Sequence, residues 1–186
     1  VELLTEHHGK YAAHIAGGAS RRIKPFLQAG ARVTVSYRAR TSDQLGSATL
    51  EPIGEGPAAL FDDPLALAGI ASAAAIAAGA LPEREPHPGA FLALEALTSA
   101  LLIADIWPAV YVRYEAGLLQ DLGFGLDLTK CASTGSTDDL THVSPRTGRA
   151  VSAAAAEPYK DRLLPLPPFL LGAQAGLAPG DVGLGL

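Results

Sequence analysis

The chain has 186 residues and is 48% hydrophobic, which is enough for a packed core and excludes a disordered protein. Its only cysteine, Cys131, excludes an internal disulfide framework and suits a reducing cytosol. The net charge of −5 divides unevenly, because residues 1–54 carry a net charge of +3 and residues 55–186 carry −8. A basic N-terminal region therefore precedes an acidic remainder.

The first fifty residues predict a small β-rich region. Its strands are expected at residues 1–5, 10–15, 32–38 and 48–53. The pair Gly17-Gly18 interrupts the pattern, and residues 20–30 are expected to form a loop. In the third strand, Val33, Val35 and Tyr37 share one face and polar side chains the other. Short strands at this spacing fit a small barrel.

After a hinge at residues 54–57, the pattern becomes helical. Asp62 or Asp63 is expected to cap a helix that begins at Pro64 and runs to about Ala80, and its Ala-rich, Gly-interrupted composition indicates burial and not a membrane span. A rigid connector at residues 81–88 and helices at 89–104 and 108–122 are expected next. They are followed by a polar, turn-rich stretch at 126–150 and a short helix at 153–156. The segment 163–172 is expected to begin in an extended conformation.

Six cations without a single acid mark the segment Ser20–Arg40, called the basic segment below: Arg21, Arg22, Lys24, Arg32, Arg38 and Arg40. Phosphate backbones are bound by such clusters through Coulomb attraction and counterion release. Strand alternation places Arg32 and Arg38 on the solvent face. The pattern predicts a nucleic-acid contact surface and not an active site, with an ordinary solvated loop as the alternative.

Other reactive side chains do not form a recognisable active site. Zinc modules repeat a C-x-x-C knuckle, whereas Cys131 is followed by Thr134 and later by Ser152 and Ala155, so three of four ligands are absent. The serines lack a nucleophile-elbow context, and the histidines lack partners at ligand spacing. We therefore expect no metal, no cofactor and no enzymatic activity.

The order of motifs resembles the RecO family of bacterial DNA repair proteins, recombination mediators of the RecF pathway. The resemblance begins in Val-Glu-Leu-Leu-Thr-Glu-His-His-Gly-Lys at 1–10 and in Gly-Gly-Ala-Ser-Arg-Arg at 17–22, with Leu-Gln-Ala-Gly at 27–30. It continues in Arg-Tyr-Glu at 113–115 and Leu-Gly-Phe at 122–124. Cys131, followed by Val-Ser-Pro at 143–145, is similar to a zinc-finger insertion of some members.

This resemblance implies an α+β fold. An oligonucleotide-binding (OB) β-barrel is expected over residues 1–56, without its first strand, which would precede Val1. A helical domain is expected over residues 57–186, with a metal-free, finger-like insertion at about 126–156. Segments are expected to be missing at both ends, including helices after Gly172.

The function implied is binding of single- and double-stranded DNA, strand annealing, and loading of RecA with RecR onto DNA coated by single-strand-binding protein. The six cations of the basic segment match the family's DNA-contact region, and Arg113 matches an arginine suited to the terminal carboxylate of that protein's acidic C-terminal tail. The expected location is cytoplasmic and nucleoid-associated, with no membrane contact. The alternative is a protein–protein adaptor that acts through the acidic helical domain without binding DNA. A second alternative, less favoured than the adaptor, is a hydrolase that uses Ser144 or the Asp138-Asp139 pair.

Overall fold

The computed structural model describes residues 1–41, 44–54, 60, 62–172 and 180–185. It confirms a mixed α+β fold and divides the chain into two compact units, residues 1–107 and 108–186. The domain boundary expected at residues 56/57 lies outside the described residues and stays a prediction. No helix in the described ranges is both long and apolar enough to cross a membrane.

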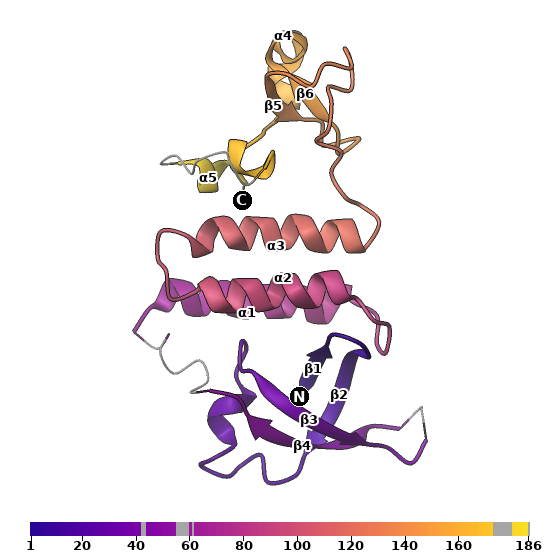
Figure 1. Cartoon of the computed structure of the whole chain (residues 1–186), viewed down its shortest axis with the longest axis vertical. Helices are drawn as coiled ribbons and strands as arrows, with labels where there is room; N and C mark the ends of the chain where they lie inside the picture. The colour runs from indigo at the N-terminus through magenta and orange to yellow at the C-terminus, as the bar shows by residue number, and fades with distance from the viewer. Residues whose placement is uncertain (42–43, 55–59, 61, 173–179, 186) are drawn as a thin grey trace. The chain divides into compact units, whose positions relative to one another are not determined.

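The four predicted strands of the first unit form one sheet in the order β1-β2-β4-β3 (Figure 1). Two of its pairs, β1 with β2 and β3 with β4, are antiparallel, whereas β2 and β4 run parallel. The strands are β1 (Glu2–Thr5), β2 (Gly9–Ile15), β3 (Val33–Arg38) and β4 (Gly46–Pro52). The predicted barrel is not closed among the described residues, because β1 and β3 form the two edges of the sheet and do not pair with each other.

One face of this sheet carries a small apolar core. Val33, Val35 and Tyr37 face it as predicted, together with buried Ala13, Ile15, Ala48 and Leu50. The expected loop contributes to the same core, since Ile23 is buried there and Leu27 packs against it. Part of that loop is a short 3-10 helix, η1 (Lys24–Leu27), which begins at a proline-containing turn.

The helices α1 (Pro64–Ala80) and α2 (Pro88–Ala100) lie side by side beyond the sheet (Figure 1). Asp63 caps α1, because its Oδ1 accepts hydrogen bonds from the backbone N–H groups of Leu65 and Ala66, each at 3.0 Å. The second helix ends at Ala100, before the predicted residue 104. The chain then turns so that the buried Trp107 ring packs against Gly69, where a Cβ atom would meet the ring at 2.7 Å.

The connector between α1 and α2 joins the helices to the β1–β2 turn. The backbone N–H of Arg84 donates to the carbonyl oxygen of Lys10 at 2.8 Å, and Lys10 Nζ donates to the last turn of α1 at the Ala78 carbonyl. Gly9 has a φ of +77°, and a Cβ atom there would lie 2.2 Å from the carbonyl oxygen of Glu85. Only glycine allows this approach of two backbones.

The second unit contains all of α3 (Trp107–Asp121) except its first residue, and the end of this helix is marked by Gly123 with a φ of +84°. The polar stretch expected to lack periodic structure contains β5 and ends where β6 begins, and these two strands form a second sheet with β7 in the order β6-β5-β7. The remaining elements of this unit are β5 (Leu140–Val143), β6 (Ala150–Ser152), α4 (Ala153–Ala156), η3 (Glu157–Arg162), β7 (Leu164–Pro165), η4 (Pro168–Leu170) and α5 (Asp181–Gly185).

Candidate nucleic-acid interface

The first half of the basic segment is an ordered turn with its cations directed outward. The backbone N–H groups of Ile23 and Lys24 donate to the carbonyl oxygen of Ser20, at 3.2 and 2.9 Å. Ile23 is buried in the sheet core, whereas Arg21, Arg22 and Lys24 on either side of it are exposed. A buried anchor between exposed cations fixes the backbone and leaves the long side chains free to reach a ligand.

The second half of the basic segment lies along β3. Thr34, Ser36 and Arg38 occupy the exposed face of this strand, as alternation predicts. The register places Arg38 opposite Ser47, and Ser47 opposite His14 on β2, so these three exposed residues form a row across three strands. This face therefore offers hydroxyl groups as well as charge to a ligand.

The six predicted contact residues do not converge on one point. Arg32 and Arg38 lie at opposite ends of β3, and six residues of extended strand span about 20 Å. Arg40 follows Arg38 and is also exposed. The cations thus form an extended strip, which suits a polyanion whose charges are spaced along its length and suits a compact anion poorly.

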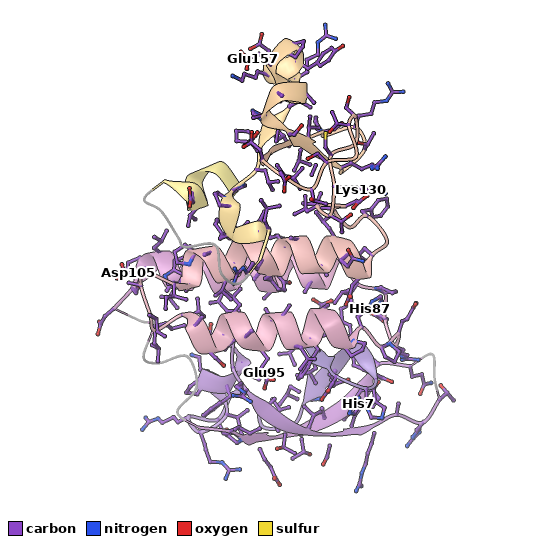
Figure 2. The ribbon with its side chains drawn as sticks, turned by 45° about the horizontal axis from the view of Figure 1, so that its top comes forward. His7, His87, Glu95, Asp105, Lys130 and Glu157 are labelled. Atoms are coloured by element: carbon purple, nitrogen blue, oxygen red, sulfur yellow. The ribbon has the colours of Figure 1, made fainter. Side chains whose placement is uncertain are left out.

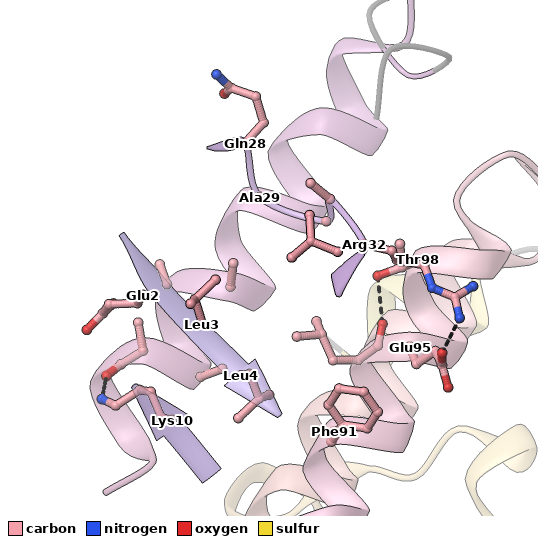
Figure 3. Close-up of a pocket in the computed structure, with 18 of the residues that line it drawn as sticks. Glu2, Leu3, Leu4, Lys10, Gln28, Ala29, Arg32, Phe91, Glu95 and Thr98 are labelled. Carbon is pink, nitrogen blue, oxygen red and sulfur yellow. Dashed lines mark hydrogen bonds and ion pairs between the residues drawn. The ribbon is translucent and has the colours of Figure 1, made fainter. Parts of the chain in front are cut away.

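Among the described residues, Arg32 is the one cation of the six that has an ion-pair partner. Its guanidinium forms an ion pair with the carboxylate of Glu95 on α2, and the side chains of the two residues are 53% and 35% exposed (Figure 3). Sequence reasoning missed Glu95, because 63 residues separate it from Arg32 and only the fold brings them together. Figure 2 shows Glu95 at the side of the helices that faces the sheet.

A pocket of about 520 Å³ adjoins this ion pair, between β1, residues 28–33 and the helices α1 and α2 (Figure 3). Its wall is mainly apolar and includes Leu3, Val33, Phe91 and Leu94, with the charged Arg32 and Glu95 at its margin. The pocket lies beside β1 and the start of β3, which are the two edge strands of the open sheet.

Arg113 lies on the exposed side of α3, in the second unit. Its Nη2 donates to the carbonyl oxygen of Phe169 at 2.8 Å, and its guanidinium lies 5.9 Å from the centroid of the Phe169 ring. With Ala116, Leu170 and Gly172 these residues line a pocket of about 280 Å³. The arrangement combines a cation with an apolar wall, and the contribution of Phe169 was not predicted from the sequence.

Cys131 is 1% exposed and accepts hydrogen bonds from the backbone N–H and the Oγ of Ser152, at 3.3 and 3.4 Å. Hydrogen bonds from Ser152 and Thr134 lower the pKa of this thiol to about 6, although burial acts in the opposite direction. Two positions that lack a zinc ligand thus support the cysteine directly. No group of three or more His, Cys, Asp and Glu side chains that could hold a metal occurs in the parts of the chain that the structure describes.

Comparison with known proteins shows the family to which the chain belongs. The model of the family "Recombination protein O C terminal" matches residues 62–179, which places the chain among recombination proteins. "DNA repair protein RecO" of Phenylobacterium zucineum (strain HLK1) is 77% identical over the whole chain and 76% of its own length. The protein of the same name from Rhodospirillum centenum (strain ATCC 51521 / SW) is 53% identical over 94% of the chain and 70% of its own length. The chain belongs to the RecO family, as its motifs predicted.

Proposed function

We propose that this chain is a DNA-binding recombination mediator that acts in DNA repair by binding and not by catalysis. It anneals DNA strands and, with RecR, helps to load RecA onto DNA coated by single-strand-binding protein. The relatives named DNA repair protein RecO support the repair role. The observation that carries direct DNA binding is the exposed strip of cations in the basic segment. A protein that works on DNA in this way is expected in the cytoplasm at the nucleoid.

The charges of the strip favour phosphate as the main contact. Among the described residues no ion pair involves Arg21, Arg22, Lys24, Arg38 or Arg40. Each of these cations can therefore bind a phosphate without first losing a described carboxylate partner. Phosphate contacts carry no base identity, so we expect weak sequence preference and strong dependence on salt.

We further propose that the first sheet is part of an OB-fold barrel. Val1 and Ala13 exchange both backbone hydrogen bonds, at 2.9 Å each, so by antiparallel alternation the backbone groups of Glu2 and Leu4 point to the free side of β1. The same rule, applied from the hydrogen bond of Ile53 to Arg32, directs Val33 and Val35 to the free side of β3. The apolar pocket adjoins β1 and the start of β3, and a further strand that paired with both of these edges would close the barrel.

The segment 126–156 is proposed to be a metal-free form of a zinc-finger-like insertion. Cys131 packs in a local core with Leu140, Val143 and Ala150, and Ala155 packs against the same core. Hydrogen bonds and apolar contacts thus occupy the positions where a zinc module would place ligands. The metal-free state is a proposal about this chain and follows from its residue types at Thr134, Ser152 and Ala155.

Direct titration of labelled single-stranded DNA, followed by fluorescence anisotropy, tests the proposed function. If about five phosphates are contacted, the slope of log affinity against log salt is about −3.5, and affinity falls about hundredfold between 50 and 200 mM salt. An affinity that does not change with salt would contradict phosphate binding. Absence of binding at low salt, with binding to a protein partner intact, would support the adaptor alternative.

For the partner tail, we propose that Arg113 binds the terminal carboxylate while the apolar wall beside Phe169 accepts a side chain. Hydrogen bonds to charged groups contribute about 1.5–3 kcal/mol, so Arg113→Ala should weaken binding of the acidic tail peptide about tenfold or more. The control is Arg146→Ala, which removes an exposed arginine in the same unit. A peptide amidated at its C-terminus should bind wild type and Arg113→Ala equally. If it does not, the assignment of Arg113 to the carboxylate is wrong.

A further inference from the structure

The ion pair of Arg32 and Glu95 sets one position of the basic segment apart. Both residues belong to the first unit, and the pair joins the residue before β3 to the middle of α2 (Figure 3). Glu95 is an anion placed where the proposed function would place a phosphate. The other five cations have no ion-pair partner among the described residues.

The pair is exposed enough to exchange partners. With 53% and 35% of the side chains accessible, water and salt reach both groups. Exposed ion pairs are weak, because solvent screens them and two long side chains must be held in place. The carbonyl oxygen of Arg32 accepts a hydrogen bond from Ile53 at 3.0 Å, so the backbone is fixed and only the side chain must rotate to reach another anion.

We propose that Glu95 is an internal competitor for DNA, which occupies the guanidinium of Arg32 and thereby weakens the hold of the basic segment on phosphate. This inference rests on the proposed function. In the wild-type protein a phosphate that binds Nη2 of Arg32 must displace the carboxylate, and a phosphate that binds another nitrogen of the guanidinium lies beside this anion. Displacement leaves Glu95 without its partner near the incoming polyanion, so Arg32 adds little net affinity and little counterion release. The ion pair therefore lowers the affinity of the protein for DNA, and Glu95 of α2 is the residue responsible.

Glu95→Gln removes the competitor and keeps the shape of the side chain. Its affinity for labelled single-stranded DNA should rise about two- to fivefold, the range expected for an exposed pair. The slope of log affinity against log salt should become more negative by about 0.7, the contribution of one additional phosphate on a single strand. Both quantities come from anisotropy titrations at three or more salt concentrations.

The matched control is Glu51→Gln, which makes the same change in net charge. Glu51 is exposed on β4, opposite Thr34, and has no ion-pair partner among the described residues. Arg32→Gln alone should change DNA affinity less than twofold, because this arginine is already occupied. In the Arg32→Gln background, Glu95→Gln should do no more than Glu51→Gln, which completes a double-mutant cycle.

Equal effects of Glu95→Gln and Glu51→Gln, with salt-dependent binding by the wild type, would overturn the inference and leave the proposed function intact. Weaker binding by Glu95→Gln would also overturn it, since Glu95 would then hold Arg32 in place for DNA. If Glu95→Gln proves unstable in a thermal melt, the DNA affinity of Arg32→Gln becomes the test. A large loss of affinity in that variant would refute the proposal that Glu95 competes with DNA for Arg32. Failure of every variant and of the wild type to bind DNA at low salt would remove the proposed function and this inference together.

Discussion

Replacement of Arg21, Arg22 and Lys24 together by glutamate should weaken binding to single-stranded DNA at least about hundredfold at 0.1 M salt. These three exposed cations flank the buried anchor Ile23. Three lost phosphate contacts reduce the salt slope by about 2, and a slope difference of 2 equals about two orders of magnitude between 0.1 M salt and a 1 M reference. Reversal of the charge adds repulsion to this loss.

Anisotropy titrations of wild type and variant at matched salt measure the effect. The control is Arg146, Lys160 and Arg162 replaced by glutamate, which changes the net charge equally in the second unit. We expect this control to lose less than tenfold. Equal losses in the two variants would mean that overall charge governs binding, and the basic segment would then have no special role.

Gly9→Ala should destabilise the protein by about 2–5 kcal/mol. Alanine at a φ of +77° costs about 1–2 kcal/mol, because its Cβ atom approaches the carbonyl oxygen that follows. Its Cβ atom would also lie 2.2 Å from the carbonyl oxygen and 2.7 Å from the backbone nitrogen of Glu85. The connector must therefore move away from the β1–β2 turn, and overpacking of this kind adds about 1–3 kcal/mol.

Urea unfolding, followed by circular dichroism, measures this loss as a shift of the midpoint. Gly17→Ala is the matched control, since Gly17 has a φ of +70° but a Cβ atom there would have nothing within 4 Å. This variant bears the backbone strain alone and should lose about 1–2 kcal/mol. Comparable losses at the two glycines would show that the close approach of Gly9 to the connector does not contribute to stability.

Local patterns in the sequence predicted the parts of the fold that are determined locally. The alternation of Val33, Val35 and Tyr37 placed β3 and its inner face correctly. Pro64, with Asp62 or Asp63 as the expected cap, located the start of α1. The second sheet was missed because β5 and β6 are only three to four residues long, and β5 lies in a polar stretch that ends where β6 begins. Their stability comes from tertiary contacts around Cys131, which no periodicity records.

In the candidate interface, too, local features were predictable from the sequence and tertiary contacts were not. Exposure of Arg21, Arg22 and Lys24 was predictable from composition, and that of Arg38 from strand alternation. The partner of Arg32 was not predictable, since no spacing rule relates a residue before a strand to a carboxylate on a distant helix. The opposite ends of β3 also separate cations that the sequence presents as one cluster.

The open sheet has a consequence for self-association. A free strand edge is a template on which another chain can add a strand, and proteins often protect such edges with charge. Here β3 (Val33–Arg38), one of the two edges, directly follows Arg32 and ends at Arg38, so an arginine lies at each end of the strand. Two copies that approached through this edge would bring like charges together. As long as this edge is open, the arginines proposed to attract DNA would therefore also disfavour edge-to-edge pairing of two copies.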